Sequence, residues 1–206
     1  MSLQITDRTK RLMIAHEGLN QPGKWPGGSS GITLGFGYDL GHHGLDEFRE
    51  DWGPHLSRET IGRLAAAIGV TGKAARALAP SFADIRIGRK AAGAVFIASS
   101  LPKYAALTEA ALPGVELLPP DAQGALVSLI YNRGGGMEDK PTDKLERRRE
   151  MRAIRDAVAA GDLREIARQL RLMKRLWRGK GLDGLLRRRE DEAALVELAA
   201  AGGAGA

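Results

Sequence analysis

The sequence contains no cysteine. Disulfide bridges, thiol nucleophiles and metal sites with thiolate ligands are therefore excluded. Aromatic residues make up only 5% of the chain, while Ala, Arg and Gly are abundant, and this balance favours a helix-rich protein. No apolar run approaches the length of a membrane span, and the first residues lack the apolar core of a signal peptide. We therefore expect a protein without a membrane span that is made in the cytoplasm without a signal peptide.

Size and charge set broad limits on the fold and on the partners. A chain of 206 residues is long enough to bury its own core as one compact domain. The net charge is +6 and the pI is about 9.8. A basic surface favours anionic partners such as nucleic acid, anionic lipid or a cell-wall polymer, but charge alone does not choose among them.

The periodicity of apolar residues predicts a mainly α protein with one small, glycine-rich β element. We expect a single α+β domain over residues 1–206. Its small β-containing lobe covers about 18–56, its helical lobe covers about 57–200 together with a first helix at 6–17, and a disordered tail covers 201–206.

Two features of the expected helical lobe are distinctive. The long helical segment at 89–112 contains Pro102, so a bend or break is expected there. The segment DAQGALVSLIYNRG at 121–134 is apolar nearly all round, which predicts a central buried helix with Asp121 as its cap.

An acidic residue and a loop without any acid stand out near the N-terminus, where residues 16–41 read HEGLNQPGKWPGGSSGITLGFGYDLG. Gly18 is a good helix terminator, so Glu17 is expected at the C-terminal end of the first helix. The negative end of the helix dipole and partial burial both disfavour an ionised carboxylate there, which is the direction that a general acid needs. The alternative is an exposed glutamate in the last helical turn.

Residues 32–40 alternate between apolar and small or polar side chains. One face carries Ile32, Leu34, Phe36, Tyr38 and Leu40, and the other carries Thr33, Gly35, Gly37 and Asp39. This alternation predicts one half-buried strand. Its almost bare second face would allow a sugar chain to approach closely. The alternative is a hairpin or bulge that requires glycine for its own geometry.

Three further patterns point to no site. The run GFGYDLG lacks the βαβ context of a dinucleotide-binding loop. His42 and His43 lack the helical spacing of zinc proteases, so they are read as surface or loop histidines rather than metal ligands. The basic run at 171–190 has interleaved acids and is read as a solvated helix face rather than a nucleic-acid site. The basic segment 138–180 carries no motif that we can assign.

Three motifs in order resemble one enzyme family. The pattern HEG, a loop and then GITLGFGYDLG resembles the start of phage-type lysozymes of glycoside hydrolase family 24 and their pesticin-like relatives. ALVSLIYNRGGGM at 125–137 looks like their central buried helix, and GLLRRREDE at 184–192 is similar to their G-L-x-x-R-R-x-x-E helix.

The resemblance implies a lysozyme-like fold with a cleft between lobes, and cleavage of peptidoglycan between N-acetylmuramic acid and N-acetylglucosamine. Glu17 matches the family's general acid, and Thr33 matches the threonine that positions water. The second acid of phage lysozymes lies in the loop between them, and here that loop has none. Pesticin-like members carry an Asp six residues after the Thr, which makes Asp39 the matching residue and that subgroup the closer one.

Geometry attaches a condition to Asp39 as a catalytic base. Six residues of straight strand span about 20 Å, whereas the two carboxyl groups of an inverting glycosidase are roughly 6.5–9.5 Å apart. The chain must therefore bend between Thr33 and Asp39, and Gly35 and Gly37 make a bulge or tight turn easy. The alternative is a structural Asp that caps the turn before Gly41.

Other candidate residues follow from the same resemblance. Arg188 or Arg189 is expected to reach the cleft and pair with Glu17, the alternative being that both are surface arginines. Gly35, Gly37, Tyr38 and Asn132 are candidate substrate-binding residues. The alternation, however, favours a core position for Tyr38, and Asn132 is read rather as fastening the end of the central helix.

The function expected from these motifs is a muramidase that needs no metal or cofactor, binds peptidoglycan, acts as a monomer and has no nucleic-acid partner. Two alternatives stay open: a lytic transglycosylase that uses Glu17 alone, and a non-catalytic module that binds cell wall or nucleic acid. A phage endolysin released by a holin and an exported antibacterial effector with a secretion machinery and an immunity protein fit the sequence equally. Both act on the cell wall, in the periplasm or outside the cell.

Overall fold

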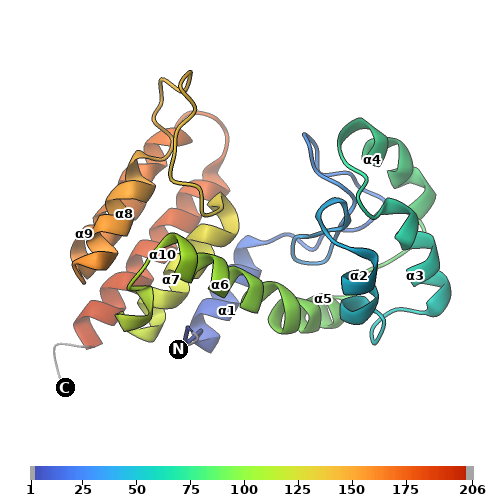
Figure 1. Cartoon of the computed structure of the whole chain (residues 1–206), viewed down its shortest axis with the longest axis horizontal. Helices are drawn as coiled ribbons and strands as arrows, with labels where there is room; N and C mark the ends of the chain where they lie inside the picture. Colours follow the sequence, from blue (N-terminus) through green and yellow to red (C-terminus); the bar gives the residue numbers. More distant parts are fainter. Residues whose placement is uncertain (1–2, 203–206) are drawn as a thin grey trace. The chain divides into compact units, whose positions relative to one another are not determined.

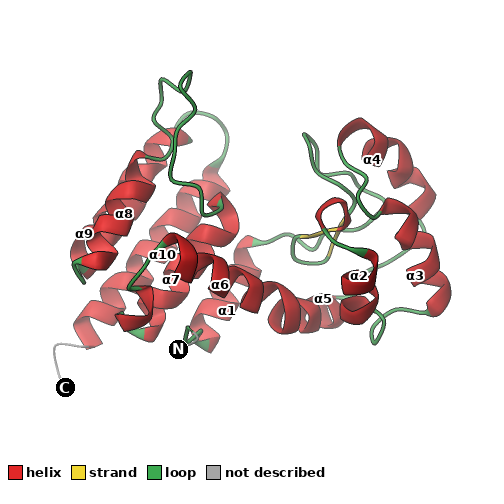
Figure 2. Ribbon diagram, viewed as in Figure 1, coloured by secondary structure: helices red, strands yellow, loops and turns green. Residues whose placement is uncertain are grey.

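The computed structural model describes residues 3–202, which form a mainly α protein with one two-stranded antiparallel sheet (Figures 1 and 2). The expected fold class is thereby confirmed. The chain divides into two compact units, Glu17–Pro102 and the combination of Met1–His16 with Lys103–Ala206. The first unit therefore extends well beyond the lobe expected at 18–56. None of the helices in residues 3–202 is both long enough and apolar enough to cross a membrane.

The unit Glu17–Pro102 combines short helices with a small hairpin. Its elements are β1 (Thr33–Leu34), β2 (Tyr38–Asp39), α2 (Leu45–Trp52), α3 (Arg58–Leu64), α4 (Gly72–Leu78) and α5 (Arg89–Val95). Phe48 and Trp52 of α2 and Leu64 of α3 are fully buried. Ser57 caps α3 by accepting a hydrogen bond from the Thr60 amide at 3.1 Å, as a serine at a helix N-terminus commonly does.

The helical segment that contains Pro102 is interrupted one turn before the proline. Residues Phe96–Ser100 form a π-helical turn between α5 and α6 (Leu101–Ala111). A proline lacks an N–H and its ring crowds the carbonyl four residues earlier. The wider π turn accommodates that carbonyl, so the expected irregularity is present at this point.

The other unit is a helical bundle built around one buried helix. Its helices are α1 (Asp7–His16), α6 from Lys103 onward, α7 (Pro120–Arg133), α8 (Arg149–Ala159), α9 (Leu163–Leu172) and α10 (Asp183–Gly202). Every residue of α7 from Ala122 to Ile130 is buried. Helices α1 and α10 pack on α7, and α9 packs between α8 and α10. The prediction of a central buried helix is confirmed.

Asp121 does not cap this helix, and that prediction was wrong. Helix α7 already begins at Pro120. The Asp121 carboxylate accepts hydrogen bonds from Thr6 Oγ1 at 2.6 Å and from Arg8 Nη1 at 2.7 Å. It therefore fastens the start of α1 to the start of α7. The N-cap position itself is occupied by Pro119, whose side chain has no acceptor.

Helix α1 approaches α7 closely at Gly124. A Cβ atom at Gly124 would lie 2.1 Å from Thr9 Oγ1, so only glycine permits this separation of the two helices. At the other end of the chain α10 continues through Ala201 and Gly202, so these two residues are helical. The remaining part of the expected disordered tail, 203–206, lies outside the described residues.

The segment expected to be one strand is a hairpin, so that prediction was wrong. Strands β1 and β2 pair antiparallel, with Thr33 opposite Asp39 and Leu34 opposite Tyr38. The turn uses Gly35 at φ 55° and Gly37 at φ 88°, a region that glycine adopts without steric cost. Alternation could not reveal the turn, because residues that face each other across a hairpin share one side of it.

We expect Gly35→Ala to destabilise the unit Glu17–Pro102. A Cβ atom there would lie 2.7 Å from the Cβ of Ala92, on a backbone with positive φ. Overpacking of this kind costs about 1–3 kcal/mol of unfolding free energy, which urea denaturation followed by circular dichroism would measure.

Gly62→Ala is the matched control. Gly62 lies inside α3 with nothing within 4 Å of the added Cβ, so the same change should stabilise the protein by about 0.5–1 kcal/mol. Equal effects of the two substitutions would contradict the assigned turn.

Candidate active site

Glu17 directly follows the last residue of α1. The helix ends at His16, and Glu17 is half-buried while Gly18 is exposed. His16 Nε2 lies 2.8 Å from Asp191 Oδ2 on α10, which holds the end of α1 in the helical bundle. Glu17 therefore lies at the helix end where the sequence predicted it.

The segment after Glu17 is tied to the hairpin by backbone hydrogen bonds. The Asn20 amide donates to the Gly35 carbonyl at 2.7 Å, and the Gly35 amide donates to the Asn20 carbonyl at 3.0 Å. Asn20 Nδ2 also donates to the Gly35 carbonyl at 3.0 Å. Three residues of chain span at most about 10 Å, so this bridge keeps Glu17 close to Gly35, the residue that follows β1.

Thr33 and Asp39 lie on the same side of the hairpin. They are direct cross-strand partners, and side chains of such a pair point to the same face. Thr33 is only 6% exposed, and its hydroxyl has a long contact of 3.5 Å to the Gly31 carbonyl. The bend that the sequence required between Thr33 and Asp39 is therefore present.

Asp39 also has a structural role. Its Oδ1 accepts hydrogen bonds from the amides of Gly31 at 3.0 Å and Gly41 at 2.9 Å, and its Oδ2 is 3.1 Å from the Gly31 amide. It caps the short 3-10 helix Leu40–His42. These bonds orient the carboxylate firmly, and they match the structural alternative that the sequence left open.

The ring of Tyr38, in β2, packs against the ring of His43. Tyr38 is 2% exposed, and its hydroxyl donates to Asp51 Oδ2 at 2.7 Å. Burial, followed by the hydrogen bond and charge of Asp51, raises the pKa of Tyr38. The Tyr38 ring stacks on His43 with centroids 3.8 Å apart, and His43 Nδ1 is 2.7 Å from the Asp39 carbonyl. Tyr38 is thus in the core, as the alternation favoured, and His43 lies in the loop that follows the 3-10 helix, with 12% of its side chain exposed.

The remaining substrate-side candidates are placed differently. Gly35 packs against Ala92 and Trp52 and Gly37 completes the turn, so hairpin geometry by itself accounts for both glycines. Asn132 is half-buried in the last turn of α7. Within residues 3–202 its side chain makes no hydrogen bond to the helix end, so the fastening role that we expected is not seen. The same part of the chain contains no cluster of three His, Cys, Asp or Glu side chains suited to a metal ion.

Arg188 and Arg189 are both buried in the helical bundle. They are 2% and 0% exposed, so the alternative that both are surface arginines was wrong. Arg188 Nη2 donates to Ser128 Oγ at 3.1 Å and to the Ser128 carbonyl at 3.2 Å. Arg189 Nη2 donates to Glu192 Oε1 at 2.7 Å. Burial lowers the pKa of Arg189, and the charge of Glu192 opposes that shift. The pairing of one arginine with Glu17 stays a prediction.

Two further members of this cluster, Ser128 and Glu192, lie within the motifs at 125–137 and 184–192, but the sequence assigned them no role. Glu192 is fully buried, and its Oε1 accepts from Ser128 Oγ at 2.6 Å and from Arg188 Nε at 3.3 Å. The spacing of Glu192 from Arg188 and Arg189, four and three residues along a helix, was a usable signal for these pairs. Ser128 gave no such signal because its partners are at least 60 positions away.

Comparison with known proteins places the chain in a family. The model of the phage lysozyme family matches residues 53–192, which is well over half of the chain, and no curated protein matches. The match includes the central helix motif at 125–137 and the arginine-rich motif at 184–192, while Glu17, Thr33 and Asp39 lie before it. The chain therefore belongs to the phage lysozyme family and is a glycoside hydrolase-type enzyme of peptidoglycan.

Proposed function

We propose that this protein is a muramidase of the pesticin-like subgroup, and that it cleaves the β-1,4 bond between N-acetylmuramic acid and N-acetylglucosamine. Membership of the phage lysozyme family supports the general activity on peptidoglycan. The subgroup rests on the loop between Glu17 and Thr33, which has no acidic residue, and on Asp39, which follows Thr33 by six residues.

Each of three residues has a separate task in the proposed reaction. Glu17 protonates the glycosidic oxygen as general acid. Thr33 orients a water molecule, and Asp39 removes a proton from that water as it attacks the anomeric carbon from the opposite face. The C–O bond to the leaving sugar breaks as the new C–O bond to water forms, and the configuration at the anomeric carbon is inverted.

The observation that carries this proposal is the register of the hairpin. Thr33 faces Asp39 across the two strands, and the Asn20–Gly35 bridge joins the same hairpin to the segment after Glu17. A straight strand would have separated Thr33 from Asp39 too far for one water molecule. The bend at Gly35–Gly37 removes that obstacle, and the backbone bonds to Asp39 provide the orientation that a catalytic base needs.

A lytic transglycosylase is the second candidate, and one observation favours it. The Asp39 carboxylate is occupied by the amides of Gly31 and Gly41, which is sufficient reason for an Asp at this position without any catalytic task. Glu17 alone would then act as acid and base, and a hydroxyl of the substrate would replace water.

Asp39→Asn distinguishes the two reactions. The amide oxygen of asparagine can still accept from Gly31 and Gly41, so the fold should be kept. Loss of the general base should reduce the rate of peptidoglycan digestion about 100-fold or more, as measured by turbidity on purified peptidoglycan.

Thr33→Val, which removes the hydroxyl at similar volume, should also reduce the rate of peptidoglycan digestion in the same assay.

Asp46→Asn is the matched control, because Asp46 is a fully exposed carboxylate in α2 that forms a long, 3.6 Å ion pair with Arg49. It should digest at the wild-type rate. Mass spectrometry of the products completes the test: reducing muropeptides support hydrolysis. Full activity of Asp39→Asn together with 1,6-anhydro products would decide for the transglycosylase.

The proposal also covers the partner of Glu17, the oligomeric state of the enzyme and the place where it acts. We expect Arg188 or Arg189 to pair with Glu17, and the enzyme to act as a monomer on the cell wall, after release by a holin or export by a secretion machinery. The net charge of +6 would assist binding to a polyanionic wall, an effect that salt weakens.

A further inference from the structure

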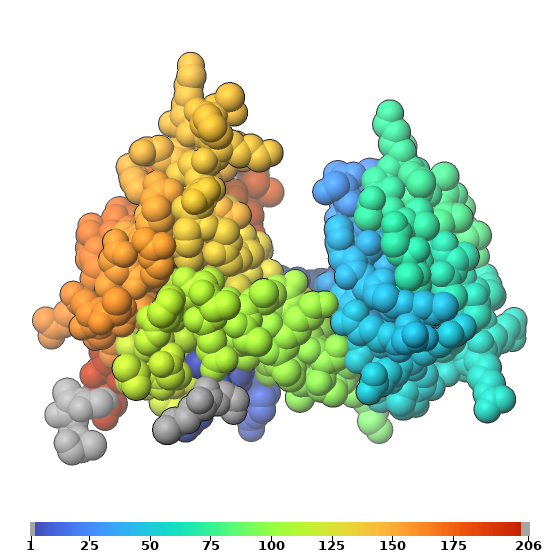
Figure 3. All heavy atoms as spheres, in the orientation of Figure 1, coloured from blue at the N-terminus to red at the C-terminus, as the bar shows by residue number. Residues whose placement is uncertain are grey.

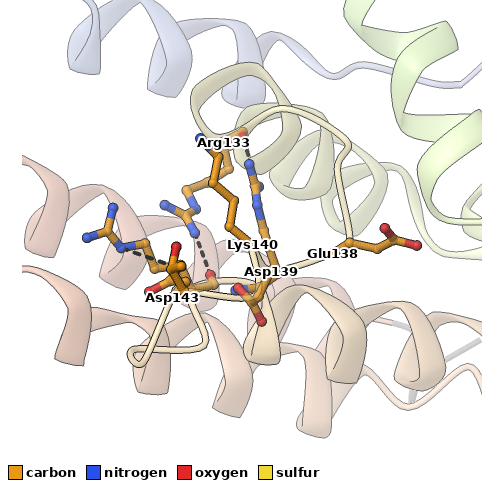
Figure 4. Close-up of a pocket in the computed structure, with 8 residues that line it drawn as sticks. Arg133, Glu138, Asp139, Lys140 and Asp143 are labelled. Carbon is orange, nitrogen blue, oxygen red and sulfur yellow. Dashed lines mark hydrogen bonds and ion pairs between the residues drawn. The ribbon is translucent and has the colours of Figure 1, made fainter.

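The loop between α7 and α8 encloses a charged cavity that the proposed reaction does not use. The loop covers 134–148 and projects from the helices of its own unit (Figures 1 and 3). The cavity has a volume of about 470 Å³ and is lined by the cations Arg133, Lys140, Arg147 and Arg148 (Figure 4). This volume lies within the range of small-molecule sites, roughly 300–1,000 Å³.

Two of the three acidic residues that line the cavity are already paired. Asp139 accepts from Arg152 Nη1 at 2.9 Å and from the Arg148 amide at 2.7 Å. Asp143 lies 3.5 Å from Arg147 Nε. The carboxylate of Glu138 is directed away from the arginine side chains in Figure 4. Among residues 3–202, no carboxylate forms an ion pair with Arg133, Arg148 or Lys140.

Two guanidinium groups are held in place by backbone carbonyls. Arg148 Nη1 donates to the Arg133 carbonyl at 2.8 Å, and Arg133 Nη2 donates to the Arg147 carbonyl at 2.6 Å. The Arg133 guanidinium also lies 5.3 Å from the centre of the Trp177 ring. These contacts fix each planar group while leaving other N–H groups available, so the site is built before any ligand enters.

Arg133 is the cation most in need of a counter-charge. It is half-buried, and its Nε is buried without a hydrogen-bond partner in the part of the chain that the structure describes. Burial, followed by the charges of Arg148 and Arg189, lowers the pKa of Arg133 to about 10. Arg133 is therefore still a cation near neutral pH, in surroundings that disfavour its charge, and a bound anion would relieve that cost.

We infer that this cavity, the Arg133 pocket, binds a phosphoryl group. Arg133, Arg148 and Lys140 come from three points of the chain and surround one space. Donors from several directions suit a tetrahedral oxyanion of charge −1 to −2, whereas one guanidinium fork is enough for a planar carboxylate. The phosphoryl group can come from free phosphate or from the phosphodiesters of an anionic envelope polymer. The site is independent of the proposed muramidase reaction.

Calorimetric titration of the full chain with inorganic phosphate tests the inference. Wild type should bind, and Lys140→Gln should raise the dissociation constant about tenfold, as expected for loss of one charged donor. Lys140 is exposed, so this variant should fold.

Arg133→Gln should raise the dissociation constant for phosphate more than Lys140→Gln does. If Arg133→Gln does not fold, Lys140→Gln still decides the test. Arg164→Gln is the matched control: an exposed arginine of α9 whose loss should leave the dissociation constant within twofold.

A second titration identifies the source of the phosphoryl group. Poly(glycerol phosphate) that binds more tightly than phosphate, and competes with it, assigns the pocket to an envelope polymer. Binding of phosphate alone assigns it to the free ion. In both cases the affinity for the ligand that binds, the polymer or inorganic phosphate, must fall in Lys140→Gln and not in Arg164→Gln.

Three results would overturn the inference: no binding of phosphate, equal loss of affinity in Lys140→Gln and Arg164→Gln, or preference for a muramyl peptide carrying carboxylates only. The binding of phosphate can be measured whether or not the protein digests peptidoglycan. Wild type that binds phosphate but does not digest peptidoglycan would overturn the muramidase proposal alone, and an active enzyme without phosphate binding would overturn the inference alone.

Discussion

Glu17→Gln is expected to reduce the rate of peptidoglycan digestion at least about 100-fold, because a positioned general acid contributes roughly 10²–10⁴-fold to such a reaction. Glutamine has nearly the shape of glutamate but carries no transferable proton. Glu17 follows the last residue of α1, and the Asn20–Gly35 bridge holds the next residues against the hairpin. The change should therefore remove chemistry and leave the backbone in place. Turbidity of purified peptidoglycan measures the rate.

Asp7→Asn controls for the loss of a carboxylate from the same helix. Asp7 is the first residue of α1 and is exposed, and it pairs with Lys10 at 3.0 Å. This variant should digest peptidoglycan at the wild-type rate. Circular dichroism must show the same helix content for both variants and wild type. If Glu17→Gln clears peptidoglycan as fast as wild type, the catalytic assignment is wrong and a wall-binding module becomes the better description.

Glu192→Ala should be the most destabilising of the single substitutions considered. The Glu192 carboxylate accepts from Arg189 at 2.7 Å, from Ser128 at 2.6 Å and from Arg188 at 3.3 Å, and both its own exposure and that of Arg189 are 0%. Removing one partner of a buried ion pair leaves a charge without compensation, at a cost of about 3–5 kcal/mol. Urea denaturation followed by circular dichroism would measure this loss of unfolding free energy.

Glu190→Ala removes a carboxylate from the same helix, two residues away. Glu190 pairs with Arg171 and Lys174, each at 2.7 Å, but its side chain is 43% exposed. Ion pairs at such positions contribute about 1 kcal/mol or less, so Glu190→Ala should be much the milder change. A loss below about 1 kcal/mol for Glu192→Ala would show that the buried cluster does not stabilise the bundle as we describe.

Local sequence signals were sufficient for several features. Glycine commonly ends a helix when it follows an amphipathic segment. Gly18 follows such a segment, so the position of Glu17 at the end of α1 could be predicted. Residues 122–130 are apolar or small except for Gln123 and Ser128, so they offer no continuous polar face and a buried central helix could be predicted. A proline inside a helical pattern removes an N–H and crowds a carbonyl, so the irregularity before Pro102 was also predictable.

Other features depended on pairings across the chain. Alternation at 32–40 is equally compatible with one strand and with a hairpin, and the choice was made by the packing of Gly35 against Ala92 and by its bridge to Asn20. Asp51 accepts from Tyr38 and Ser99, residues whose connection no local pattern reveals. The Arg133 pocket likewise depends on a loop closing over the end of α7.

The sequence by itself determined the helical fold class, the place of Glu17 at a helix end, and the absence of an acid between Glu17 and Thr33, because helix periodicity, helix termination and composition are local properties. Only the tertiary structure decided that Thr33 faces Asp39 and that Arg188 and Arg189 are buried around Glu192. Strand register depends on which residues pair across the turn, and burial depends on which distant residues pack over a side chain. Both are fixed only when the chain has folded.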